Sequence, residues 1–189
     1  DVIGFSAYIW NIEIINHLLK QLKIDYPEKT IILGGPEVSY KSDDYIIDRL
    51  ADFIICNEGE VAFDLLLNAL DRKTLDFSHI PNLIYIRDEK IHKNRVENIK
   101  DLNKLKDPYP LFEDKDMAHK IQYVELSRGC PYQCAYCLAS LEKGLRFFDV
   151  DHVLNIIDYL VKKGAKTFKF LDRSFNANHR LAQAFLSKL

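Results

Sequence analysis

Three of the four cysteines of this 189-residue chain fall within eight residues, in the run Ser-Arg-Gly-Cys-Pro-Tyr-Gln-Cys-Ala-Tyr-Cys. Cys130, Cys134 and Cys137 have the spacing C-x3-C-x2-C. A cubane iron–sulfur cluster normally takes four thiolates, one for each iron. Three thiolates on one loop leave an iron open, and an open position is how a metal site admits a substrate or cofactor. The loop therefore predicts a [4Fe–4S] cluster that binds and reduces a small molecule.

Two other interpretations use the same thiols. A structural zinc site needs a fourth ligand, which Cys56, His119 or His152 would have to supply, and none stands at C-x2-C or H-x3-H spacing. The chain would then be a non-catalytic, metal-binding regulatory module, with zinc or an iron–sulfur centre, on a flavodoxin-like domain. Cys134 and Cys137 alone also form a C-x2-C pair, which is typical of redox dithiols.

The elements around the cysteine loop predict a strand–loop–helix–strand unit. An apolar strand over Ile121–Leu126 runs directly into the loop, and a second strand is expected over Thr167–Leu171. Between them, apolar residues repeat at helical spacing: Val153, Ile156, Ile157 and Leu160. Asp149 or Asp151 is expected to cap this helix and Gly164 to end it. A further helix is expected to open near Asn178.

The first 75 residues alternate short apolar strands with helical patterns. The strands are expected over Val2–Phe5, Ile31–Leu33 and Phe53–Cys56, and Asn11 is expected to cap the first helix. Strand–helix alternation predicts a parallel sheet with right-handed crossovers. Because three strands close such a sheet poorly, we expect more of it before Asp1. With the helical pattern that ends at Leu189, this indicates a piece of a longer protein.

Residues 76–118 have a different pattern. Asn82–Ile86 and Lys90–Val96 flank Arg87-Asp88-Glu89 and predict a β-hairpin, and Asp107-Pro108-Tyr109-Pro110 favours extended backbone. We therefore expect three segments: an α/β domain over 1–75, a linker with a β-hairpin over 76–118, and a second α/β domain over 119–189.

The strand leading into C-x3-C-x2-C, with Tyr136 just before the last cysteine, resembles the signature of radical S-adenosylmethionine (radical SAM) enzymes. The resemblance implies the start of a (β/α) partial TIM barrel in which Cys130, Cys134 and Cys137 hold a [4Fe–4S] cluster. It implies that the open iron binds S-adenosylmethionine, whose reductive cleavage gives a 5′-deoxyadenosyl radical. Tyr136 would lie beside the adenine, and Asp172 and Ser174 occupy the place where many members carry a Gly-Gly-Glu motif. That triplet is absent here.

The first half resembles the latter part of a cobalamin-binding domain of the flavodoxin/Rossmann-like type. Such domains carry a serine motif after one strand and a Gly-Gly pair after the next, and Ser6-Ala7-Tyr8 and Gly34-Gly35-Pro36 stand there. Asn57-Glu58-Gly59-Glu60 resembles a Gly-Glu-Gly-Glu segment often found after the following strand. Glycines let a bulky ligand approach the backbone at this edge.

The order of these motifs is similar to that of B12-binding-domain radical SAM enzymes, including the family of the anaerobic magnesium-protoporphyrin IX monomethyl ester cyclase. By resemblance, cobalamin contacts come from eight residues: Ser6, Tyr8, Gly34, Gly35, Pro36, Asn57, Glu58 and Gly59. A cobalt-binding histidine motif, Asp-x-His-x-x-Gly, belongs before Asp1 in this family. The alternative is a corrinoid-type fold that serves as a scaffold or substrate platform.

The composition excludes several classes of function. A net charge of −2 gives no electrostatic case for nucleic-acid or membrane partners, and no apolar run reaches the length of a membrane span. Four cysteines without a paired framework favour a reducing, cytoplasmic location. The resemblance further implies an oxygen-sensitive enzyme with a small-molecule substrate and a flavodoxin- or ferredoxin-type electron donor. The reaction implied is methyl transfer or oxidative cyclisation, and we expect this piece alone to be inactive.

Overall fold

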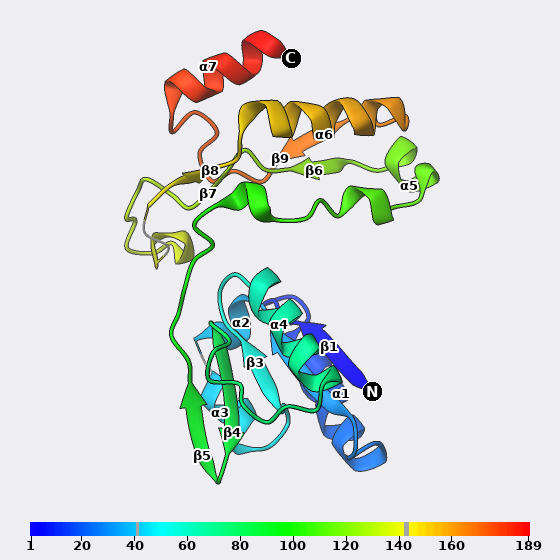
Figure 1. Ribbon diagram of the computed structural model, residues 1–189, viewed down its shortest axis with the longest axis vertical. Coiled ribbons are helices and arrows are strands. Elements are labelled where there is room, and N and C mark those ends of the chain that lie inside the picture. The colour runs from blue at the N-terminus through cyan, green and yellow to red at the C-terminus, as the bar shows by residue number, and fades with distance from the viewer. Residues whose placement is uncertain (41, 142–143) are drawn as a thin grey trace. The chain divides into compact units, whose positions relative to one another are not determined.

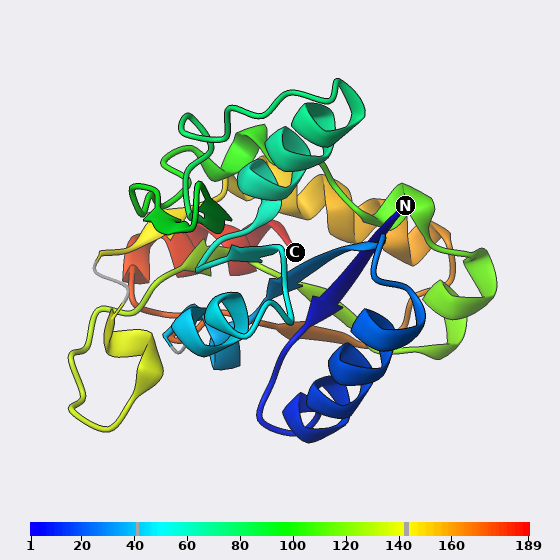
Figure 2. The same ribbon diagram turned by 90° about the horizontal axis from the view of Figure 1, so that it is seen from below.

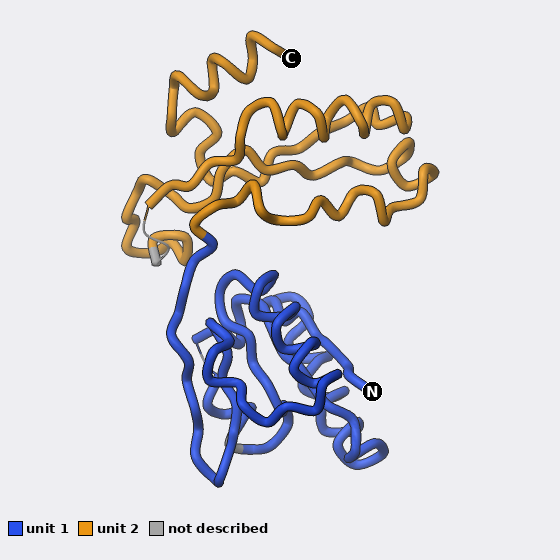
Figure 3. The backbone as a smooth tube through the Cα atoms, viewed as in Figure 1, with its two compact units in different colours: residues 1–99 blue, residues 100–189 orange. Residues whose placement is uncertain are grey.

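The computed structural model describes residues 1–40, 42–141 and 144–189. The chain divides into two compact units, Asp1–Ile99 and Lys100–Leu189 (Figure 3). Each buried hydrophobic cluster lies within a single unit, so each unit has a core of its own. Among the described helices, none combines the length and hydropathy that crossing a membrane requires.

Unit 1 is built on a five-stranded sheet in the order β1-β2-β3-β4-β5 (Figure 1). Strands β1 (Val2–Ser6), β2 (Thr30–Gly34) and β3 (Phe53–Ile55) are parallel, as the strand–helix alternation predicted. Strand β4 (Leu83–Arg87) runs antiparallel to β3 and forms a hairpin with β5 (Lys90–Lys93). The mixed α/β class predicted from the sequence is confirmed.

Helices cover both faces of this sheet (Figure 2). Buried residues of α1 (Ile12–Asp25), α2 (Pro36–Ser39) and α3 (Ser42–Ile47) share one hydrophobic cluster with buried residues of β2 and β3. Helix α4 (Glu60–Asp71) packs on the opposite face through Ala62, Leu66 and Ala69. The helices that connect β1 to β2 and β2 to β3 share one face because successive right-handed crossovers that advance in one direction place their helices on the same side.

The hairpin lies inside unit 1, whereas the sequence led us to expect it within a linker over 76–118. Leu83 pairs with Ile55, and the first three residues of β4 are buried. The units divide between Ile99 and Lys100, so the expected linker segment is shared between them. Leu83, Ile84 and Tyr85 are apolar on both faces, which predicts a buried strand but does not identify its partner.

Unit 2 contains one β–α–β unit. Strand β6 (Gln122–Val124) pairs in parallel with β9 (Phe168–Phe170), and α6 (Val150–Lys162) connects them. Strand β7 (Ser127–Arg128) pairs antiparallel with β8 (Arg146–Phe147). The remaining elements are short helical segments and a last helix: η1 (Leu102–Lys104), η2 (Tyr109–Leu111), α5 (Asp114–His119), η3 (Leu138–Leu141) and α7 (His179–Lys188).

The helix caps predicted in unit 2 are confirmed. The Asp149 carboxylate accepts hydrogen bonds from the N–H groups of Asp151 and His152 at the start of α6. Gly164 follows α6 with φ of +96°, a left-handed conformation that glycine adopts without strain. The Asn178 side chain accepts a hydrogen bond from Leu181 N and caps α7.

Candidate functional site

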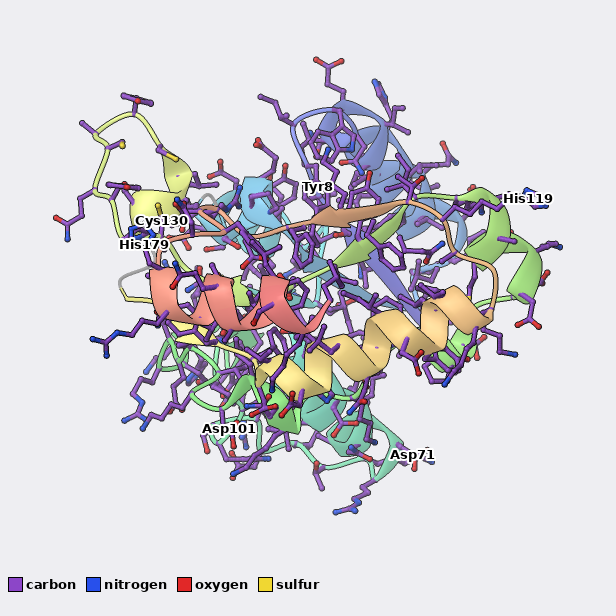
Figure 4. The ribbon with its side chains drawn as sticks, turned by 90° about the horizontal axis from the view of Figure 1, so that it is seen from above. Tyr8, Asp71, Asp101, His119, Cys130 and His179 are labelled. Carbon is purple, nitrogen blue, oxygen red and sulfur yellow. The ribbon has the colours of Figure 1, made fainter. Side chains whose placement is uncertain are left out.

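The cysteine loop is closed at its base by paired backbone. Ser127 pairs with Phe147, Arg128 pairs with Arg146, and Phe148 N donates to Leu126 O at 3.0 Å. The loop itself, which carries Cys130 (labelled in Figure 4), extends from this base. This pairing therefore holds the chain in place at both ends of the loop.

The two arms of the loop touch just beyond that base. Gly129 has φ of +93°, and a Cβ placed there would lie 2.0 Å from Gly144 O. No real Cβ contact is that short, so only glycine fits at position 129. Nothing in the sequence alone distinguished this glycine from one used for an ordinary turn.

The three loop cysteines are free thiols that are open to solvent to different degrees. Cys130 and Cys134 are partly exposed, and Cys137 is exposed. The N–H of Cys137 donates to Cys134 O at 3.0 Å, and Ser140 N donates to Cys137 O at 3.0 Å. Within residues 1–40, 42–141 and 144–189, no three His, Cys, Asp or Glu side chains converge as a metal site. The type and number of donors fit a cluster with one open iron, but the thiols are not pre-arranged around one.

The three residues expected to contact S-adenosylmethionine lie in different surroundings. Tyr136 is 93% exposed at the tip of the loop. The Asp172 carboxylate is directed to the base of the loop, where it accepts hydrogen bonds from Leu126 N at 2.9 Å and Ser127 Oγ at 2.6 Å. The carbonyl oxygen of Ser174 accepts a hydrogen bond from Ala177 N. Contact of Tyr136, Asp172 and Ser174 with S-adenosylmethionine stays a prediction.

A second candidate site lies at the carboxyl edge of the parallel strands of unit 1. The register places Ser6 beside Gly34 and Gly34 beside Ile55, so the segments that follow β1, β2 and β3 meet at one edge. Ligands of open α/β sheets bind at this edge. The structure thus brings together the three segments that the resemblance assigned to cobalamin.

The two glycines at this edge differ in what they do. Gly35 has φ of +100°, and a Cβ there would lie 2.4 Å from the backbone oxygen of buried Ala7. Gly34 tolerates a Cβ, because the nearest atom to one added there is Ile55 O at 3.7 Å, an ordinary van der Waals distance. Gly35 is therefore required by the fold, whereas the fold does not require glycine at position 34. Pro36 follows and begins α2.

The loop after β1 exposes aromatic surface beside Ser6. The rings of Tyr8 (labelled in Figure 4) and Trp10 stack with centroids 4.6 Å apart, and Trp10 is 74% exposed. Asn11 holds this loop: its Oδ1 accepts from Tyr8 N at 2.8 Å and its Nδ2 donates to Ser6 O at 3.0 Å. Asn11 stands at the N-cap position of α1, as expected, but its side chain makes no capping hydrogen bond. A flat apolar surface at this edge fits the face of a corrin ring.

The segment after β3 is hydrogen-bonded to the end of α2 and to the end of unit 1. Asn57 has φ of +54°, and its N–H donates to Ser39 Oγ at 3.3 Å, which in turn donates to Gly35 O at 2.9 Å. The Glu58 carboxylate accepts a hydrogen bond from Ile99 N at 2.6 Å. Gly59 immediately precedes α4. Asn57 and Gly59 keep their predicted place at the edge, while Glu58 holds the chain where it leaves unit 1.

Sequence reasoning missed Asn82, which organises this part of unit 1. Its buried side chain donates to Glu58 O and Glu97 O, both at 2.9 Å, and accepts from Glu97 N at 2.7 Å. Its φ is +61°, a conformation that asparagine tolerates better than most residues. An asparagine directly before an apolar strand was the available signal.

Cys56 is buried, unlike the three loop cysteines. It lies buried at the end of β3, and burial raises the pKa of its thiol to about 11. A thiol that stays protonated is a poor nucleophile and a poor metal ligand. Its surroundings match the expectation that Cys56 is a core residue.

Comparison with known proteins shows what the two parts of the chain are similar to. Residues 1–67 match the B12 binding domain family. The cobalamin-dependent radical SAM methyltransferase TokK from Streptomyces tokunonensis is 24% identical, a match over 97% of this chain and 30% of that protein. The chain spans between 28% and 35% of the length of three curated relatives that it matches.

Two solved structures share the fold. The cobalamin-dependent radical enzyme OxsB, with aqua-cobalamin and S-adenosylmethionine bound, covers 97% of this chain with a TM-score of 0.79 and 19% identity; the chain covers 27% of it. The methyltransferase TsrM from Kitasatospora setae, with cobalamin and a [4Fe–4S] cluster bound, covers 99% with a TM-score of 0.70 and 14% identity; the chain covers 40% of it. The predicted resemblance to radical SAM enzymes with an N-terminal B12-binding-type domain is confirmed.

Proposed function

We propose that Cys130, Cys134 and Cys137 hold a [4Fe–4S] cluster whose open iron binds S-adenosylmethionine, and that the chain is part of a cobalamin-dependent radical methyltransferase. The observation that carries the proposal is the set of three accessible thiols on one loop at the carboxyl end of β6. Chemistry in α/β barrels sits at this end of the strands. A cluster bound here supplies the electron that cleaves S-adenosylmethionine.

Cobalamin is the second proposed cofactor, at the edge formed by Ser6, Gly34 and Asn57. A glycine at position 34 that the fold itself does not require and the exposed stack of Tyr8 and Trp10 support it. The relatives that are methyltransferases favour transfer of a methyl group onto a small organic substrate over oxidative cyclisation. We further propose a flavodoxin- or ferredoxin-type protein as the electron donor and the cytoplasm as the location.

Anaerobic reconstitution with iron and sulfide tests the cluster. We expect about four irons per chain and a reduced-state electron paramagnetic resonance (EPR) spectrum that changes when S-adenosylmethionine is added. Cys137→Ser should lower the iron content, whereas the matched variant Cys56→Ala should keep it, because Cys56 is a buried thiol outside the loop. Stoichiometric zinc without iron-dependent colour would instead support the regulatory metal-binding module.

Titration with hydroxocobalamin tests the second cofactor. Gly34→Val adds a side chain at the sheet edge, where the nearest fold atom is an ordinary 3.7 Å from the added Cβ. We expect this variant to fold and to bind hydroxocobalamin at least about tenfold more weakly than the parent. Substitution of Gly35 is unsuitable for this test, because a side chain there would overlap the backbone of Ala7 and disturb the fold. Equal binding by parent and Gly34→Val would count against cobalamin at this edge.

A further inference from the structure

Asp172 links strand β9 to the base of the cysteine loop. It follows β9, and Leu171 N donates to Val124 O at 2.9 Å, so the pairing of β6 with β9 continues up to this residue. Beyond Leu171 the two segments are joined by the side chain of Asp172 instead of by backbone pairing. One carboxylate oxygen accepts from Leu126 N at 2.9 Å and the other from Ser127 Oγ at 2.6 Å.

Both donors belong to buried residues, so water has little access to replace Asp172. Leu126 is 1% exposed and Ser127 is 4% exposed. Leaving a buried donor without an acceptor costs the full desolvation of that group, and hydrogen bonds to a charged acceptor are among the stronger ones. Asp172 therefore contributes to fixing the chain at Leu126 and Ser127, four and three residues before Cys130.

Leu126 is held from two sides. Its N–H is bound by Asp172 and its carbonyl oxygen accepts from Phe148 N at 3.0 Å, on the returning arm of the loop. Next along the chain, Ser127 pairs with Phe147. The carboxylate, the first arm and the returning arm thus meet at one residue, and the cysteines lie on the segment between the two arms.

We propose, on the basis of the proposed cluster function, that Asp172 is a positioning residue for the cysteine loop. By fixing Leu126 and Ser127 it sets the direction in which Cys130 leaves the sheet, and so reduces the conformational freedom that the thiols lose when they bind iron. Direct contact of Asp172 with the methionyl amine of S-adenosylmethionine is the alternative role, and the experiments below distinguish the two.

Amide hydrogen exchange of the metal-free chain tests the anchor without any cofactor. In Asp172→Ala, which removes both acceptor oxygens, exchange at Leu126 should rise about tenfold. Amides within α6 should be unchanged. The matched control Asp158→Ala removes an exposed carboxylate that pairs with Lys162 and should leave Leu126 at the parent rate. Parent-like exchange at Leu126 in Asp172→Ala would overturn the proposal.

Cluster retention gives the second readout. After reconstitution, iron transfer to a chelator should be about tenfold faster from Asp172→Asn than from the parent, and Ser127→Ala should show a smaller increase. The EPR change on adding S-adenosylmethionine should persist in Asp172→Asn. Loss of that change with parent-like iron retention would make Asp172 a ligand contact and would refute the positioning role. If the parent itself binds no cluster, the proposed function fails, while the exchange experiment still decides whether Asp172 anchors the loop.

Discussion

Gly35 shows how a single residue at the sheet edge is fixed by contact with backbone. A Cβ at position 35 would lie 2.4 Å from Ala7 O, at a φ of +100° that side chains rarely adopt. Gly35→Ala should lower the free energy of unfolding by about 2–4 kcal/mol, from backbone strain and overpacking together. Gly4→Ala is the control, since nothing lies within 4 Å of an added Cβ there. Urea denaturation of both variants measures the difference, and equal midpoints would contradict the contact.

Cys56 provides a pH-dependent test at the same scale. Its thiol pKa is raised by burial from 9.0 to about 11 in the folded chain. Below pH 9 both folded and unfolded forms are protonated, and between pH 9 and about 11 the unfolded form ionises first. The free energy of unfolding should therefore fall over this window in the parent, relative to Cys56→Ala. Denaturation of both proteins below pH 9 and near pH 11 measures this; a constant difference would show that Cys56 is not buried as described.

At the scale of elements, Asn82 joins the hairpin, the segment after β3 and the end of unit 1. Asn82→Ala removes three side-chain hydrogen bonds and leaves Glu97 N without its acceptor. We expect a loss of about 2–4 kcal/mol in the free energy of unfolding. Asn68→Ala, which removes one exposed hydrogen bond within α4, should change it by less than about 0.5 kcal/mol. Similar denaturation midpoints for the two variants would contradict this role.

The elements that the sequence predicted correctly are those with a local cause. Apolar runs identified the strands of unit 1, and Asp149 and Asn178 identified helix starts, because capping acts within a few residues. The pairing of β4 with β3 depends on a long-range choice that an apolar run does not encode. Asp172 likewise contacts residues 45 and 46 positions away, which no local pattern reveals.

The same distinction applies to the candidate sites. Spacing alone predicted the thiols as ligands. The ends of three strands predicted a second site, and the register brings those ends together at one edge of the sheet. The arrangement of Cys130, Cys134 and Cys137 around a metal is not present in the described residues. A metal contributes much of the free energy that orders its own ligands, so neither sequence nor fold alone determines that geometry.

For the whole molecule, the separation of the cores predicts how the chain unfolds. Two buried clusters cover the two faces of the five-stranded sheet within Asp1–Ile99, and the third lies within Lys100–Leu189. A protein of residues 1–99 should therefore fold cooperatively by itself. In calorimetry of the full chain, reconstitution with iron should raise the midpoint of one transition, because a ligand stabilises the unit that binds it. That iron-dependent transition should be missing from residues 1–99. An unfolded 1–99 protein, or one that iron stabilises equally, would show that the units do not fold separately or that the cluster ligands lie outside the loop.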